Sequence, residues 1–220
     1  YAKVPFDAVK DFEPVALIAT LPYVLVVHPS LQVKSVTQLI DYAKARPGKL
    51  SVAGSAPGLA QHLGWELFKR MSATDIVYVP YKGSALQMPD LLAGRVQAAI
   101  DSLLILVPHM KTGALQGLAV TSAARSPLLP DLPTVAEVAL PGFQASGWFG
   151  VFAPAKTPAD VVRKLNGQIA AIMQQPDVRE RLVAQGVEPV SGSPDQMRKW
   201  LAQEVNVWSK VIRDAGLKLD

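Results

Sequence analysis

The middle of the chain alternates short apolar runs with segments of helical hydrophobic spacing, and this alternation limits the possible folds more than any other feature. The helix after the first run is predicted to begin at Ser35, which forms a capping box with Gln38 three residues on. Apolar runs separated by helix-length segments are typical of a parallel α/β sheet with right-handed crossovers. The pattern predicts five such strands, at residues 23–27, 50–53, 76–79, 96–100 and 115–120.

The two ends of the chain carry different patterns. Residues 12–20 are predicted to form a strand with nothing before it to pair with, and residues 143–152 another strand. Three helices are predicted to follow, beginning near Thr157, Pro176 and Ser193, where cap residues or early prolines mark the starts. The last helix carries an apolar stripe that favours a core-facing surface. We expect the two end segments to form one domain that the central domain interrupts.

Composition limits the class of protein. The chain has 220 residues, of which 50% are hydrophobic and 18% charged. A chain of this length buries roughly 70–75% of its unfolded surface, so it needs neither disulfides nor a structural metal. Its longest apolar stretch, Val15–Val27, contains Thr20 and Pro22 and is shorter than the roughly 18 residues that span a membrane. We therefore expect a globular protein that does not span a membrane.

Charge and cysteine content exclude further classes. The 22 Lys and Arg residues exceed the 18 Asp and Glu residues only slightly, and no basic run is longer than two residues. A nucleic-acid-binding surface would show clustered basic residues, so no nucleic-acid partner is expected. The absence of cysteine excludes thiol chemistry and Cys-based zinc sites, and it agrees with an oxidising compartment.

The carboxyl ends of the predicted strands are the expected place for a ligand, because open parallel sheets bind ligands in the crevice beyond those ends. Two of the segments there are loops of small residues that lead into a helix, whose first N–H groups and dipole favour an anion by about 0.3–1 kcal/mol. This predicts a site for a small carboxylate. The alternative is that Gly54 and Gly58 only form a tight turn. The four segments are Gly54–Gly58, Tyr81–Ser84, Asp101–Ser102 and Thr121–Ser122.

Known nucleotide and hydrolase motifs are absent. The sequence contains no G-x-G-x-x-G, no G-x-x-x-x-G-K-[ST] and no G-x-S-x-G. Ser55, His62 and Asp101 have the residue types of a catalytic triad, but His62 lies about one turn into a predicted helix. That position favours a buried histidine that anchors the helix. The three histidines lack metal-ligand spacing, and no cofactor is expected.

Several predicted edge residues allow two interpretations. Asp101 either accepts a hydrogen bond from a ligand ammonium group or caps the following helix, and the capping role is favoured. Tyr81 and Trp148 are either walls of a pocket or parts of the core. Lys82 either faces the charge of a ligand or faces water.

Several strings along the chain carry a resemblance to a known family. They are VVHPS at residues 26–30, PYKGS at 80–84, AVTS at 119–122, LPDLPT at 129–134 and WFG at 148–150. With these strings the chain resembles, nearly from end to end, the Bug family of extracytoplasmic solute receptors. These are the TctC-like substrate-binding proteins of tripartite tricarboxylate transporters.

The resemblance implies a type II periplasmic-binding-protein fold, in which two doubly wound α/β domains are joined by a hinge. Residues 1–20 and 146–220 would form a partial first domain, and residues 21–145 a complete second domain. Members of the family begin with a strand, a Gly-rich loop and a helix that have no counterpart here, so the first domain is expected to lack its N-terminal part. The expected hinge segments are Thr20–Pro22 and Ala145–Gly147.

The resemblance also implies a periplasmic, non-enzymatic receptor. It would capture a small organic carboxylate between two domains and deliver it to membrane permease components. No signal peptide is visible in the chain, which starts at Tyr1. Where relatives usually have Ser or Thr, this chain has Leu59 and Ala60, so either backbone N–H groups and waters hold the carboxylate or the ligand has a more apolar part. The implied ligand-binding residues are Gly54, Ser55, Ala56, Gly58, Leu59, His62, Tyr81, Lys82, Gly83, Ser84, Asp101 and Ser102.

Two alternatives from other functional classes remain at this point. The first is a hydrolase on the same α/β frame that uses Ser55 or Ser84 as its nucleophile. The second is a ligand-sensing regulatory domain, which would require a DNA-binding segment upstream. A fold by itself does not decide between a receptor, an enzyme and a regulator.

Overall fold

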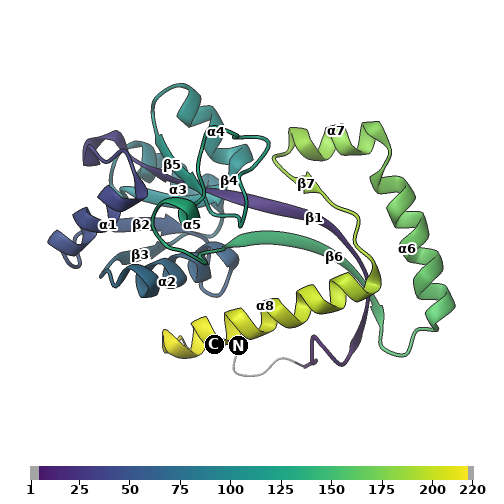
Figure 1. Cartoon of the computed structure of the whole chain (residues 1–220). Coiled ribbons are helices and arrows are strands. Elements are labelled where there is room, and N and C mark those ends of the chain that lie inside the picture. Colours follow the sequence, from purple (N-terminus) through teal and green to yellow (C-terminus); the bar gives the residue numbers. More distant parts are fainter. Residues whose placement is uncertain (1–4, 218–220) are drawn as a thin grey trace. The chain divides into compact units, whose positions relative to one another are not determined.

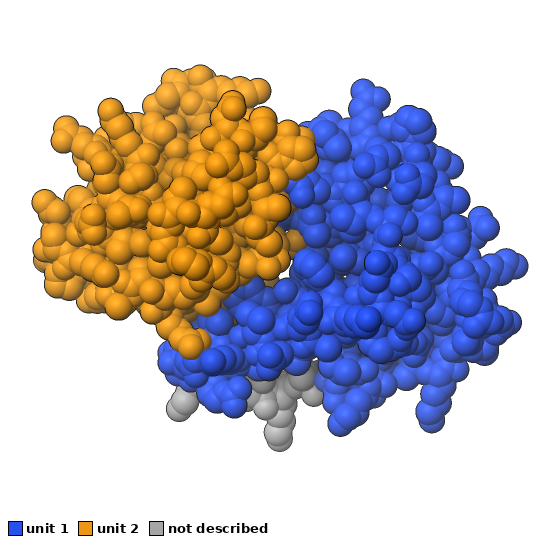
Figure 2. All heavy atoms as spheres, in the orientation of Figure 1, with its two compact units in different colours: residues 1–21, 148–220 blue, residues 22–147 orange. Residues whose placement is uncertain are grey.

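The computed structural model describes residues 5–217 (Figure 1). The chain divides into two compact units, which Figure 2 distinguishes by colour. Unit 1 comprises Tyr1–Leu21 and Trp148–Asp220, and unit 2 comprises Pro22–Gly147. Unit 1 is therefore built from both ends of the chain and unit 2 from one continuous stretch. Strand β1 (Phe12–Val27) contributes its first half to unit 1 and its second half to unit 2.

Unit 2 contains a mixed sheet of order β3-β2-β4-β1-β5. β2 is parallel to β3 and β4, whereas β1 is antiparallel to both β4 and β5. The α/β architecture and the five predicted strands are confirmed. The prediction of a fully parallel sheet is wrong for residues 23–27. Besides β1, the strands are β2 (Ser51–Gly54), β3 (Val77–Pro80), β4 (Ala98–Ser102) and β5 (Gln116–Val120).

The direction of β1 could not be read from its sequence. Val24–Val27 is completely buried, and a run that is buried on both faces has the same pattern in either direction. No helix of unit 2 precedes it, so the rule for right-handed crossovers does not apply. The two strands expected at residues 12–20 and 23–27 are one continuous strand, and Pro22 lies within it.

Helices follow the strands of unit 2. α3 and α4 pack on one face of the sheet, where Leu91 and Leu106 lie in one apolar cluster with Val24, Ala53 and Ala99. The connections β2–β3 and β3–β4 run in opposite directions along the sheet, and right-handed crossovers then place α2 and α3 on opposite faces. The helices are α1 (Val36–Ala45), α2 (Ala60–Ser72), α3 (Ser84–Leu92), α4 (Leu103–Lys111) and α5 (Val135–Val138), with a 3-10 turn at Pro29–Leu31.

Two predicted helix starts differ in detail. Ser35 caps α1 as expected, since its Oγ accepts from the Gln38 N–H at 3.2 Å. The Gln38 side chain, however, accepts from the N–H of Lys34 at 2.7 Å, so the predicted capping box forms only in half. Thr157 does not cap the helix that is predicted to begin near it, because its hydroxyl donates to the Pro154 carbonyl at 2.7 Å.

Unit 1 is arranged around the first half of β1, which pairs with β6 (Ser146–Pro154) and β7 (Glu188–Pro189). The Asn166 side chain donates to the carbonyls of Val15 at 2.8 Å and Gly192 at 2.9 Å, which ties its helix to this sheet. The buried Met197, Leu201 and Val211 confirm the predicted core-facing stripe of the last helix. The helices are α6 (Ala159–Met173), α7 (Pro176–Ala184) and α8 (Pro194–Asp214). Within residues 5–217, none of the helices is both long and apolar enough to cross a bilayer.

Thr121 joins the two segments through which the chain enters and leaves unit 2. Its backbone N–H donates to the Tyr23 carbonyl and its carbonyl accepts from the Ala145 N–H, both at 2.9 Å. Its buried Oγ1 lies 2.5 Å from the Ala145 carbonyl oxygen and 3.2 Å from that of Tyr23. One side chain thus holds together the two segments that lie next to the expected hinges.

Removing the Thr121 hydroxyl should weaken unit 2. In Thr121→Val the two buried carbonyls lose a hydrogen-bond donor, so we expect the free energy of unfolding to fall by about 1–3 kcal/mol. Denaturant titration measures this change. Thr121→Ser keeps the hydroxyl and is the matched control; equal stability of the Val and Ser variants would contradict the assignment.

Candidate functional site

The candidate site lies where the parallel strands of unit 2 end. Segments 54–59, 81–84, 101–102 and 121–122 lie at or directly after the last residues of β2, β3, β4 and β5, and we call this region the carboxyl edge. From β2 the chain continues to β3, which is one edge strand of the sheet, whereas from β4 it continues to β5, which is the other edge strand. The connections that leave the carboxyl ends of the neighbouring parallel strands β2 and β4 therefore run towards opposite edges of the sheet. Open α/β sheets bind ligands at such a position.

Within residues 5–217, three helices that begin at the carboxyl edge have no side-chain cap. Their N-cap residues are Leu59 for α2, Gly83 for α3 and Ser102 for α4. Ser35 and Thr134 do cap the other two α-helices of unit 2. An uncapped first turn presents N–H groups with no partner inside the helix, together with the positive end of the helix dipole. This edge is therefore suited to a negatively charged group.

Glycines shape the turns before these helices. Gly83 has φ +140°, a conformation that other residues rarely adopt, and among the described residues other than its chain neighbours none has an atom within 4 Å of where a Cβ would be. Gly58 has φ +85°, and its N–H donates to Nδ1 of His62 at 3.1 Å. At Gly54 a Cβ would lie 2.6 Å from the Tyr78 hydroxyl, so Gly54 makes room for this tyrosine.

Exposed leucines accompany the three uncapped helix starts. Leu59 is the N-cap of α2, Leu86 lies in the first turn of α3, and Leu104 lies in the first turn of α4. Their side chains are 49%, 61% and 50% exposed. The carboxyl edge therefore combines free N–H groups with apolar surface.

Asp101 is buried beneath the carboxyl edge, with only 2% exposure. Its Oδ1 accepts from the Ser102 N–H at 2.7 Å and from Nε2 of Gln61 at 3.3 Å, and its Oδ2 accepts from Nε2 of Gln87. Ser102 is itself the N-cap of α4, so the expected capping of this helix by Asp101 does not occur. Both carboxylate oxygens are already held by neutral N–H groups of the protein.

His62 anchors the start of α2. Its ring is buried and lies 4.5 Å from the Tyr78 ring, measured between centroids. Nδ1 accepts from the Gly58 N–H, and Nε2 lies 3.9 Å from the Glu66 carboxylate. Burial lowers the pKa of His62, and this effect outweighs the opposing effect of Glu66. His62 is therefore neutral at pH 7 and serves as a packed anchor.

Stability should fall as the pH drops from 7 to 5. The folded pKa of His62 is below its ordinary value of 6.5, so the unfolded chain binds the proton more readily and folding loses free energy as pH falls through this window. Urea titrations at several pH values measure the slope. His62→Gln should flatten it, and an unchanged slope in this variant would contradict a neutral, buried His62.

The hydrolase interpretation finds no bonded triad. The Ser55 hydroxyl donates to Oε1 of Gln61 at 2.9 Å, while His62 is bonded to Gly58 and Asp101 to amides. Thus none of the three proposed triad residues has another as its partner in these bonds.

The remaining predicted residues divide between the edge and the core. Tyr81 packs against the apolar cluster of unit 2, and its hydroxyl donates to Asp90 at 2.7 Å. Burial and this bond raise the pKa of Tyr81 to about 12. Lys82 is exposed, whereas Ser84, Ala56 and Ser102 are partly buried. Trp148 belongs to unit 1, where its indole N–H donates to Glu204 at 2.8 Å.

Sequence reasoning missed Gln61, Gln87 and Tyr78. Gln87 is completely buried and lies one turn before Leu91 on the same face of α3. A polar residue on an otherwise apolar helical stripe was the signal that identifies it. Tyr78 is found only through its contacts, since its hydroxyl donates to the Ser55 carbonyl at 2.5 Å and burial raises its pKa.

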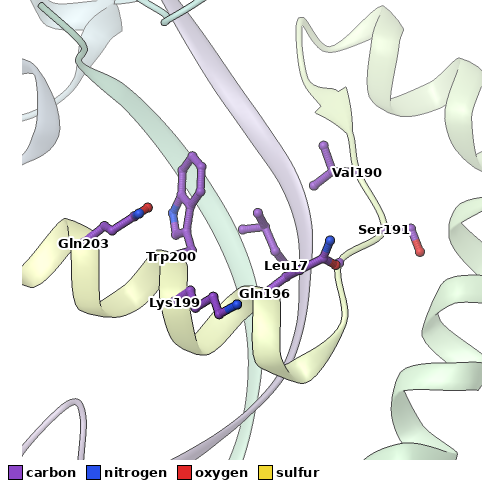
Figure 3. Close-up of a pocket in the computed structure, with 8 residues that line it drawn as sticks. Leu17, Val190, Ser191, Gln196, Lys199, Trp200 and Gln203 are labelled. Atoms are coloured by element: carbon purple, nitrogen blue, oxygen red, sulfur yellow. The ribbon is translucent and has the colours of Figure 1, made fainter. Parts of the chain in front are cut away.

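Unit 1 contains a separate hollow of about 380 Å³ between β1, α8 and the segment after β7 (Figure 3). Its lining is mostly apolar and includes Leu17, Val190 and Trp200. The start of α8 beside it is already capped, because Ser193 and Gln196 form a complete capping box. This hollow thus lacks the free helix start that the carboxyl edge offers to an anion.

Comparison with known proteins identifies the family of the chain. Residues 1–217 match the tripartite tricarboxylate transporter family receptor. BugT of Bordetella pertussis is 39% identical over 216 residues, which cover 98% of this chain and 66% of BugT. The chain thus spans just under two thirds of the length of this relative.

Two solved structures are also similar. R. palustris Rpa4515 with adipate is 42% identical, with a TM-score of 0.84 over 98% of this chain and 72% of that one. MatC from Rhodopseudomonas palustris with bound malate is 30% identical, with a TM-score of 0.79 over 96% and 72%. Because the family match extends over residues 1–217, the chain belongs to the receptor family of tripartite tricarboxylate transporters, the TctC-like and Bug solute-binding proteins.

Proposed function

We propose that this chain binds a small organic carboxylate at the carboxyl edge of unit 2. The observation that carries the proposal is the uncapped start of α2, α3 and α4 at one edge of one sheet. Each helix start offers unpaired N–H groups and a partial positive charge to an anion. No charged side chain is needed for such a contact.

The ligand that fits best has an apolar chain as well as a carboxylate. Leu59, Leu86 and Leu104 bring exposed apolar surface to the three helix starts, and a ligand of methylene groups would cover that surface. The similar structures hold adipate and malate, both of which are carboxylates. Of these two, adipate has the longer apolar chain and suits the three leucines better.

The remaining parts of the receptor function rest on family membership. These parts are capture of the ligand between two domains, delivery to membrane permease components and action in the periplasm. Division of the chain into a partial first domain and a complete second domain belongs to the same proposal. The family consists of solute-binding receptors rather than enzymes, and no bonded triad supports the hydrolase alternative.

Calorimetric titration with a small panel tests the proposal. We expect adipate to bind more tightly than malate or citrate, and to raise the unfolding temperature, because a ligand at a hundred times its Kd adds about 2.7 kcal/mol to stability. Adipamide, the uncharged diamide of adipate, is the matched control and should bind poorly. Binding of adipamide as tight as that of adipate, or no binding of any acid, would overturn the proposal.

A further inference from the structure

Asp101 is an acidic residue buried among neutral hydrogen-bond donors. It lies at the end of β4 with 2% exposure, and its three hydrogen-bond donors are two side-chain amides and one backbone N–H. Burying a carboxylate is costly unless its oxygens are well bonded. Asp101 meets that requirement through residues that come from different parts of unit 2.

The donors to Asp101 come from the three helices that begin at the carboxyl edge. Gln61 lies in the first turn of α2, Gln87 lies in α3, and Ser102 is the N-cap of α4. Gln61 also accepts from the Ser55 hydroxyl, which extends the network into the loop after β2. Since α2 and α3 lie on opposite faces of the sheet, Asp101 links them around the end of β4.

Gln87 shows that this link is kept at an energetic cost. Its side chain has 0% exposure, and within the described residues its Oε1 has no hydrogen-bond partner. An unsatisfied buried acceptor destabilises a protein, and a leucine at this position would avoid that cost. The contribution that only the amide makes is the bond from its Nε2 to Asp101.

We propose that Asp101, Gln61 and Gln87 form a positioning network that sets the placement of the starts of α2, α3 and α4 for one ligand carboxylate. Asp101 is a positioning residue in this arrangement and does not touch the ligand, because its oxygens are taken by the three donors. This inference rests on the proposed carboxylate binding. It adds that affinity depends on buried side chains that the ligand never reaches.

Gln87→Leu cuts the network on the α3 side. We expect the Kd for adipate to rise about tenfold, since displaced N–H groups lose well-aligned bonds to the carboxylate. Calorimetric titration of the full chain measures the change in Kd, and urea titration measures the accompanying change in stability.

Gln97→Leu is the matched control. Gln97 precedes β4, at the end opposite the carboxyl edge, where its Oε1 accepts from the Ser51 N–H at 2.8 Å and its Nε2 donates to the Gly94 carbonyl at 3.2 Å. Losing these bonds should cost comparable stability while the Kd for adipate stays unchanged. An equal rise in Kd for both variants would reduce the role of Gln87 to general stability and overturn the inference.

An exchange of chemical groups provides a rescue test. Gln87→Glu places two carboxylates together and should weaken adipate binding. In the double variant Asp101→Asn/Gln87→Glu, the new asparagine amide donates to the new glutamate, and its oxygen still accepts from Gln61 and Ser102. We expect the double variant to regain most of the affinity that Gln87→Glu loses, and no regain would contradict the network.

Hydrogen exchange without ligand separates this inference from the proposed function. Gln87→Leu should speed amide exchange at residues 63–66 of α2, whose N–H groups make the first bonds inside that helix, although the substitution lies in α3. Gln97→Leu should leave that segment unchanged. If the wild type binds no carboxylate, the proposed function fails, while faster exchange at residues 63–66 would still support the link. Exchange that rises only within α3 overturns the link.

Discussion

Leu59→Asp should make the protein more stable and at the same time remove most of its carboxylate binding. Leu59 is the N-cap of α2, has extended backbone angles of φ −81° and ψ 166°, and makes no side-chain cap. Aspartate is a preferred N-cap, so we expect the free energy of unfolding to rise by about 1 kcal/mol. Its carboxylate would occupy and neutralise the helix start that the ligand needs.

The loss of binding should be large. A second negative charge about 4 Å from the ligand carboxylate costs several kcal/mol in a partly buried site, which corresponds to at least about a hundredfold in Kd. Calorimetric titration with adipate and urea titration measure the two opposite effects on the same protein.

Leu59→Asn is the control that separates charge from capping. Asparagine caps a helix about as well as aspartate but adds no charge, so it should raise stability similarly and reduce adipate affinity by a smaller factor. A Leu59→Asp variant that is stabilised and still binds adipate at the wild-type Kd would show that the start of α2 is not part of the site.

Trp65→Ala should cause the largest loss of stability in unit 2. Trp65 is completely buried, its indole N–H donates to the Ala53 carbonyl at 3.1 Å, and its ring packs edge-on against Phe68 at 5.4 Å. Removing a buried tryptophan costs about 3–5 kcal/mol, which is a large share of the roughly 5–15 kcal/mol by which a folded domain is stable. The bond to Ala53 also fixes α2 against β2, and with it the start of α2.

Trp65→Phe is the control for this prediction. Phenylalanine keeps most of the apolar contact and loses the bond to Ala53, so the destabilisation should be roughly 1–2 kcal/mol beyond the smaller packing loss. Denaturant unfolding followed by far-UV circular dichroism measures both variants. A Trp65→Ala variant within 1 kcal/mol of the wild type would contradict a core role for this residue.

Much of the fold could be predicted because its signals are local. The strands of unit 2 are short apolar runs, and the caps at Ser35 and Ser193 mark helix starts directly in the sequence. No local sequence signal gives the direction of the second half of β1, since a fully buried run has the same pattern in a parallel and an antiparallel strand. That information resides in the pairing of residues 23–27 with β4 and β5.

The candidate site was predictable in outline and not in its internal bonds. The loops after the strands could be placed at one edge because parallel strands end together. Whether Asp101 faces a ligand, caps a helix or bonds to Gln61 and Gln87 depends on which side chains meet in the folded unit. These partners are 40 and 14 residues away from Asp101 along the chain, so no local pattern joins them.

The most direct measurement of the central claim is a titration of the ¹⁵N-labelled chain with adipate, followed by the backbone amide shifts. Binding at the uncapped helix starts should move the amides of residues 60–62, 84–85 and 103–105 most strongly, because their N–H groups gain a charged acceptor. Adipate binding that leaves these amides unmoved, and shifts only those lining the hollow beside Trp200 in unit 1, would contradict the account.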